Sequence, residues 1–129
     1  MPVPRSLDGF DVTAAVERML DQPMLWWQAV GLFVEHFADW ESGWQESIGD
    51  DAWEQKKVHA LRSAAANVGA MALAEVAADL EGLLLKRREG KVKSVPNIVR
   101  QRLRDSFRLT WRAAAGAWQP GPPGSGERA

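Results

Sequence analysis

The apolar residues of this chain recur every three or four positions, and this spacing constrains the fold more than any other feature. It is clearest between positions 26 and 44, where it comprises Trp26, Val30, Phe33, Phe37, Trp40 and Trp44. Such spacing lines one face of an α-helix, whereas a half-buried β-strand would need strict alternation. The stripe therefore predicts one long helix with a buried aromatic face.

Similar stripes and helix-ending signals predict the rest of the fold. A short helix is expected from Asp11 to Leu20, and further long helices at about 51–68, 70–88 and 96–118. The expected caps and first-turn residues are Asp11, Asp21, Pro23, Asp50 or Asp51, Ser94 and Pro96. No strand pattern or internal repeat stands out. We therefore expect an all-α, antiparallel up-down-up-down four-helix bundle with a short extra N-terminal helix over one end.

Length and composition favour one globular domain. The chain has 129 residues, of which 46% are hydrophobic, and it contains no cysteine, which excludes disulfides and thiolate metal sites. No leader-like or membrane-spanning apolar run is seen, so a cytoplasmic protein without membrane contact is expected. The predicted domain spans 7–118, between a linker at 1–6 and a disordered, Pro/Gly-rich tail at 119–129.

Charge is distributed unevenly along the chain. Residues 1–85 carry a net charge of −9 and residues 86–112 a net charge of +8. The favoured interpretation is that acidic and basic helices pack against each other. The alternative is a nucleic-acid surface on the fourth long helix, formed by Arg100, Arg104, Arg108 and Arg112.

His59 lies outside the buried stripe of its helix, which comprises Val58, Leu61, Ala65 and Val68. Gln55, Arg62, Ser63 and Ala66 share its face at positions i−4, i+3, i+4 and i+7. An exposed imidazole is a good nucleophile near neutral pH, and a guanidinium one turn away suits phosphoryl oxygens. The face therefore favours phosphoryl chemistry, although an ordinary surface histidine remains an equal alternative on these residues alone.

An antiparallel return of the next helix would bring residues 80 and 81 level with His59. Leu80 belongs to the core stripe, so Glu81 is expected nearer the edge, where it could accept a hydrogen bond from the imidazole and orient it. A solvated glutamate is the alternative. The second histidine, His36, has no histidine, cysteine or carboxylate pair nearby, so it is interpreted as structural and no metal site is expected.

The run "HALRSAAANVGA" resembles the signature of histidine-containing phosphotransfer (HPt) domains. The family pattern has a histidine, then leucine, Lys or Arg, a Gly or Ser, and a later glycine; His59, Leu61, Arg62, Ser63 and Gly69 match it in register. The stretches "LDGFDV" at 7–12 and "LE" at 80–81 extend the similarity. Arginine replaces the more frequent lysine, and serine the more frequent glycine.

The resemblance implies that His59 accepts a phosphoryl group from a receiver-domain aspartate and passes it to another receiver. Arg62, Ser63, Glu81 and Gln55 would support the reaction, with Ala66 and Gly69 in the docking surface. The expected partners are response-regulator receivers and an upstream sensor histidine kinase. The chain would be a monomeric carrier without a nucleotide site, possessing no cofactor of its own, since Mg²⁺ belongs to the receiver.

Three alternatives to this assignment remain. A helical interaction module without phosphotransfer and a nucleic-acid-binding bundle are the first two. The third is the phosphoacceptor helix pair of a sensor kinase, which usually has an acidic residue directly after the histidine and a proline shortly beyond it. Here Ala60 follows His59, and the next proline is Pro96. The N-terminal stretch "MPVPRS" would suit a linker, so a C-terminal module of a hybrid kinase is the favoured interpretation and a free-standing protein is the alternative.

Overall fold

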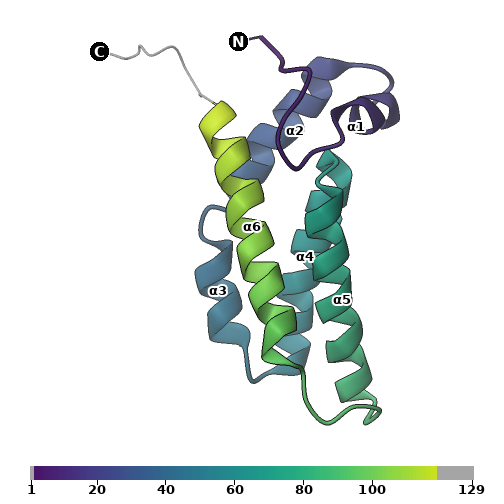
Figure 1. Ribbon diagram of the computed structural model, residues 1–129, viewed down its shortest axis with the longest axis vertical. Helices are drawn as coiled ribbons and strands as arrows, with labels where there is room; N and C mark the ends of the chain where they lie inside the picture. Colours follow the sequence, from purple (N-terminus) through teal and green to yellow (C-terminus); the bar gives the residue numbers. More distant parts are fainter. Residues whose placement is uncertain (1, 119–129) are drawn as a thin grey trace, which may run out of the picture.

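The computed structural model describes residues 2–118, and within that range it contains α-helices and no β-strand (Figure 1). The helices are α1 (Val12–Arg18), α2 (Pro23–His36), α3 (Trp40–Ser47), α4 (Asp51–Val68), α5 (Met71–Arg88) and α6 (Asn97–Ala117). The predicted tail at 119–129 lies outside the described residues.

The helices form an antiparallel bundle with four arms. α2 and α3 together make the first arm, and α4, α5 and α6 then run alternately up and down, as Figure 1 shows. α1 lies across the end of the bundle where α4 meets α5, and it contacts both α2 and α4. The predicted all-α bundle with a short additional N-terminal helix is confirmed.

The region of α2 and α3 differs from the prediction, because the single long aromatic helix that was expected there is divided into two helices. α2 ends at His36, with Phe37 as its C-cap, and α3 begins at Trp40. The break lets the indole N–H of Trp40 donate to the backbone oxygen of Lys57 at 2.9 Å, while its ring stacks on Trp44. A regular 3–4 spacing shows which residues are buried, but it does not reveal that the axis changes direction between them.

The turn between α1 and α2 is also displaced from the prediction. Asp11 caps α1 as expected, accepting a bond from the backbone N–H of Ala14. Asp21, however, is not the cap of α2: Gln22 occupies that position, followed by Pro23 in the first turn. Leu20 and Asp21 both have positive φ, at 61° and 55°. Because these two residues form the turn itself, the carboxylate of Asp21 lies one residue too early to cap the helix.

The junction between α4 and α5 places His59 at a defined level of the bundle. Asp50 caps α4 as predicted, and Gly69 ends it with φ of 88°. A Cβ on Gly69 would lie 2.7 Å from the backbone oxygen of Asp11 and 3.0 Å from Cβ of Ala15. Glycine is therefore needed here both for its left-handed backbone and for the close approach of α1. α5 then returns antiparallel along α4.

Candidate functional site

His59 projects from the middle of α4 into solvent. Its side chain is 55% exposed, whereas Val58, Leu61 and Ala65 on the opposite side of the helix are fully buried. The prediction that His59 lies outside the core stripe is confirmed. One edge of its ring nevertheless faces α5, so the imidazole is exposed and anchored at the same time.

Glu81 of α5 supplies that anchor. Its carboxylate is buried, with only 4% of the residue exposed, and it binds three side chains of α4. Oε2 lies 2.9 Å from Nδ1 of His59 and accepts a bond from Nε2 of Gln55 at 2.7 Å. Oε1 accepts a bond from Nη1 of Arg62 at 2.8 Å. The predicted proximity of Glu81 to His59 is confirmed, and Gln55 and Arg62 join the same cluster.

The ionisation of Glu81 determines which nitrogen of His59 is free. Burial acts to raise the pKa of the Glu81 carboxyl, but hydrogen bonds from Arg62, Gln55 and His59 outweigh it, so the pKa lies below its usual range. An ionised carboxylate only accepts hydrogen bonds. Nδ1 of His59 must therefore carry a proton, which in the neutral ring leaves the lone pair on Nε2, the other nitrogen.

Arg62 has a partner within the bundle. Its guanidinium is bonded to Glu81, a contact that the sequence did not indicate. Its contact with incoming phosphoryl oxygens stays a prediction. Its side chain is still 48% exposed, so it remains accessible from the His59 face. In this arrangement the positive charge of Arg62 compensates the negative charge of the buried Glu81 carboxylate.

The other predicted site residues lie further along α4. Ser63 is exposed one turn beyond His59, and Ala66 is half-buried. The backbone oxygen of Ala66 accepts a bond of 2.9 Å from Nη2 of Arg18, which reaches across from α1. Gly69 is buried against Asp11. Its burial and left-handed backbone give it a structural role at the end of α4, and the docking role stays a prediction.

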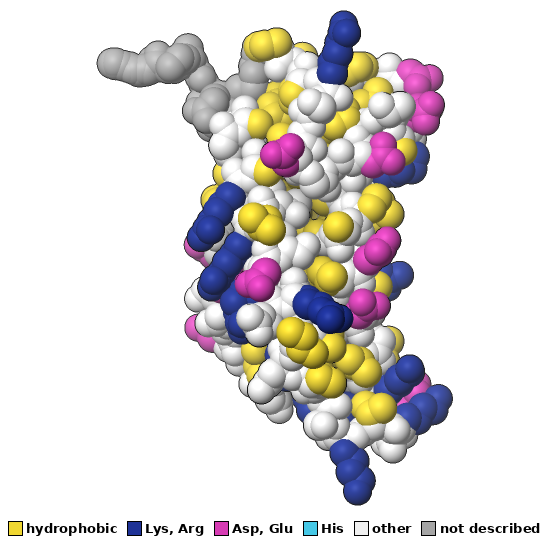
Figure 2. Space-filling model, viewed as in Figure 1, with side chains coloured by type: hydrophobic (Ala, Val, Ile, Leu, Met, Phe, Trp, Pro, Cys, Tyr) yellow, Lys and Arg dark blue, Asp and Glu magenta, His cyan; other side chains and the backbone are white. Residues whose placement is uncertain are grey.

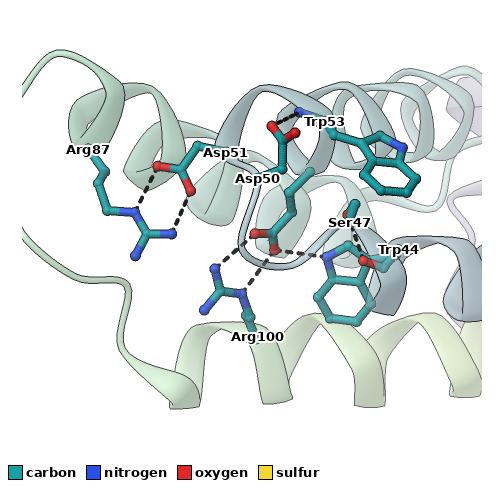
Figure 3. Close-up of polar contacts among 8 residues, drawn as sticks. Trp44, Ser47, Asp50, Asp51, Trp53, Arg87 and Arg100 are labelled. Atoms are coloured by element: carbon teal, nitrogen blue, oxygen red, sulfur yellow. Dashed lines mark hydrogen bonds and ion pairs between the residues drawn. The ribbon is translucent and has the colours of Figure 1, made fainter.

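A second carboxylate cluster, which the sequence analysis missed, lies at the N-terminal end of α4 (Figure 3). Glu54 is fully buried and receives two bonds from Arg100 of α6, at 2.9 and 2.8 Å. The indole N–H of Trp44 in α3 donates to the same carboxylate at 3.0 Å. A signal was present: Glu54 lies four residues before Val58 and so continues the buried stripe of α4.

The basic residues of α6 are largely engaged within the bundle. Arg100 binds Glu54, Arg104 lies 5.6 Å from the ring centre of Trp44, and Arg108 binds Glu41 of α3. Hydrogen bonding to Arg108 holds the pKa of Glu41 below its usual range, despite partial burial. The interpretation that acidic and basic helices pack together is confirmed.

The second histidine lies apart from the Glu81 cluster. His36 is exposed in the last turn of α2, where it borders a shallow groove between α2 and α4. It is therefore a surface residue and not the structural one that we expected. Among residues 2–118, no three histidine, cysteine or acidic side chains are arranged to hold a metal ion. None of the helices in this part of the chain is long and apolar enough to cross a membrane.

Comparison with known proteins identifies the family. The family model described as "Hpt domain" matches residues 50–114, a stretch that runs from the cap of α4 through α5 into the last turn of α6. It includes His59 and Glu81. Searches among curated proteins and among solved structures returned no match. The match covers half of the chain, and its position agrees with the helical bundle and the histidine motif. The chain belongs to the Hpt domain family.

Proposed function

We propose that His59 is the phosphorylated residue of this Hpt domain. Members of the family carry phosphoryl groups in phosphorelays and act as carrier modules. The observation that supports the assignment is the asymmetry of the His59 ring: Nδ1 is bonded to the buried Glu81, and the side chain as a whole is 55% exposed. This leaves Nε2 as a neutral nucleophile that a partner can reach.

The proposed step is a transfer from the aspartyl phosphate of a receiver domain. The lone pair on Nε2 forms the N–P bond, the bond from phosphorus to the aspartyl oxygen breaks, and its electron pair leaves with the receiver's carboxylate. Passage to a second receiver reverses these events. Because such transition states are loose, alignment and charge neutralisation supply most of the catalysis. The Mg²⁺ used in this chemistry would be held by the receiver, with no cofactor on this chain.

Arg62 is proposed to assist by neutralising charge on the phosphoryl oxygens. To reach them, its guanidinium would leave Oε1 of Glu81, the atom to which it is bonded at 2.8 Å. The exposure of Arg62 supports such a movement, since the side chain already borders solvent. Gln55 would remain on Oε2 and keep one bond to the carboxylate.

The receiver is proposed to dock around His59 on α4 and α2. On the wheel of α4, Ser63 lies between His59 and Asn67, and Asn67 lines the apolar groove against α2. Leu32 borders this groove with 57% of its surface exposed. Ala66, a predicted docking residue, lies on the other side of His59, where its small side chain leaves space for a partner beside the imidazole. Apolar surface beside the reacting group suits a transient protein partner.

Basic residues beside this surface favour an acidic partner. Lys56 and Arg62 flank His59 on α4, and Arg18 lies over Ala66. Receivers hold their aspartates in acidic pockets, so this charge would speed their encounter with the bundle. We further propose that the protein acts in the cytoplasm as a monomer between a sensor histidine kinase and response regulators, in a free-standing form or as part of a hybrid kinase.

The alternatives have less support. A nucleic-acid surface would require a row of free arginines on α6, but three of the four predicted ones, Arg100, Arg104 and Arg108, have partners within the bundle. Arg112 alone does not make such a row. An interaction module without phosphotransfer would have no use for an exposed imidazole anchored by a buried carboxylate.

Transfer from a phosphorylated receiver tests the proposal directly. Wild-type protein should acquire label that is labile in acid and stable in base, whereas His59→Gln should lose at least about 100-fold in transfer rate because the nucleophile is absent. His36→Gln is the matched control and should be labelled like wild type. Equal labelling of the His59→Gln variant, or an acid-stable label, would contradict the assignment.

A further inference from the structure

The two ring nitrogens of His59 have different surroundings, and the difference bears on the phosphorylated state. Nδ1 lies against Glu81, which is only 4% exposed, while the His59 side chain as a whole is 55% exposed. We propose that Glu81 is a positioning residue that keeps the proton on Nδ1 after Nε2 has been phosphorylated, and so keeps the phosphohistidine able to donate. This inference rests on the proposed function and extends it to the return step.

The requirement follows from the balance of atoms and charge. After attack, the ring carries phosphorus on Nε2 and a proton on Nδ1, so it is an imidazolium. When a receiver carboxylate attacks the phosphorus, the N–P bond breaks and its electron pair returns to Nε2, which leaves a neutral imidazole. If Nδ1 had lost its proton, the leaving group would be an imidazolate anion, which is far more basic. Retention of that proton therefore keeps the transfer reversible.

The chemistry of the Glu81 cluster supports this role. A carboxylate can only accept from Nδ1, whereas a glutamine at the same place could turn its amide and donate, which would favour a ring without the Nδ1 proton. The donors recorded to Glu81 are Gln55, His59 and Arg62, all on α4. Both Gln55 and His59 use Oε2, so the amide of Gln55 holds in place the oxygen that accepts the hydrogen bond from Nδ1.

Nearby charges act in opposite directions on this proton. The positive charge of Arg62, which is bonded to Oε1 of Glu81, reduces the attraction of the carboxylate for the proton on Nδ1. Arg88 of α5 lies further away and reaches the cluster only through the side-chain oxygen of Gln55, at 3.5 Å. Lys56 is exposed on the neighbouring turn of α4. Glu81 is the one acidic group bonded to the ring among the described residues, so the proton depends on this carboxylate.

The test needs no receiver, because phosphoramidate can phosphorylate an exposed histidine chemically. Nitrogen-15 and phosphorus-31 NMR of the full chain would identify the phosphorylated nitrogen and follow the pH midpoint at which the phosphohistidine loses its proton. We expect phosphorus on Nε2. We expect the Glu81→Gln midpoint to lie at least about one pH unit below that of wild type, a tenfold loss of proton affinity. Glu75→Gln, at an exposed position of α5, is the matched control and should titrate like wild type.

A second measurement needs no variant. Wild-type phosphoprotein unfolded in urea loses the contact with Glu81, so its midpoint should fall below that of the folded protein by a similar amount. Return transfer to a receiver at alkaline pH should also decline at least about tenfold more in Glu81→Gln than in wild type.

Equal midpoints in wild type and Glu81→Gln would overturn the inference even if a receiver labels His59, and so would phosphorus on Nδ1. Conversely, failure of every receiver to label His59 would count against the proposed function while the titration still reports on Glu81. The two ideas therefore fail separately.

Discussion

Two buried carboxylates bind α4 to its neighbours, and their surroundings differ in one decisive respect. Glu54 is fully buried, and its charged partner Arg100 has a side chain only 12% exposed. Glu81 is nearly as buried, but its partners His59 and Arg62 are 55% and 48% exposed. The first cluster is closed inside the bundle, whereas the second connects the interior to solvent.

The comparison indicates that the closed cluster serves mainly to stabilise the bundle, whereas the open cluster orients side chains that can react. A buried ion pair whose members are both enclosed holds helices in one arrangement, and the removal of one member leaves the other without compensation. A buried carboxylate with exposed partners restrains those partners on one side and leaves their other side free to react. Figure 2 shows a different face of the molecule, over α5 and α6, where basic, acidic and apolar side chains are interspersed and no histidine is visible.

The largest expected effect is at the closed cluster. Glu54→Gln removes the negative charge opposite Arg100, so the free energy of unfolding should fall by about 3–5 kcal/mol. Urea denaturation followed by tryptophan fluorescence and circular dichroism would measure it. Glu46→Gln, at an exposed position of α3, is the control and should remain within about 0.5 kcal/mol of wild type. A loss below about 1 kcal/mol for Glu54→Gln would remove the distinction between the two clusters.

A smaller loss is expected at the open cluster. In Glu81→Gln, Arg62 and His59 can bind water in place of the carboxylate, because both are about half exposed. The expected loss in the free energy of unfolding is about 1.5–2 kcal/mol, at the lower end of the range for hydrogen bonds to charged groups. The same urea titration measures it. If this variant lost as much stability as Glu54→Gln, the open cluster would be as structural as the closed one.

The smallest expected effect is in the pH dependence. The pKa of Glu81 is lower in the folded protein than its ordinary value of 4.5. Its contribution to stability is therefore fully present above that ordinary value, and is lost as the pH falls through the lower folded value. Between about pH 6 and about pH 3, wild type should lose slightly more stability than Glu81→Gln. Thermal unfolding across this range would detect the difference; a greater loss in the variant would show that the sign is wrong.

Much of the fold and of the site could be predicted from local patterns. Helical spacing identified the buried faces, Asp11, Asp50 and Gly69 marked helix ends, and the wheel placed His59 outside the core. Because the next helix was expected to return antiparallel to the helix of His59, residues 80 and 81 could be placed level with the histidine, which located Glu81. The break between α2 and α3 was not predictable in this way, because the 3–4 spacing continues through Phe37 and Trp40 although the chain turns there.

The sequence by itself determined that this is an all-helical Hpt bundle with His59 on its surface, because periodicity, capping and the histidine motif are local properties. Only the tertiary structure decided which charges meet. Arg62 is bonded to Glu81 and Arg100 to the buried Glu54, pairs 19 and 46 residues apart in the chain. The physical reason is that burial and pairing depend on how whole helices pack, and no window of sequence contains both partners.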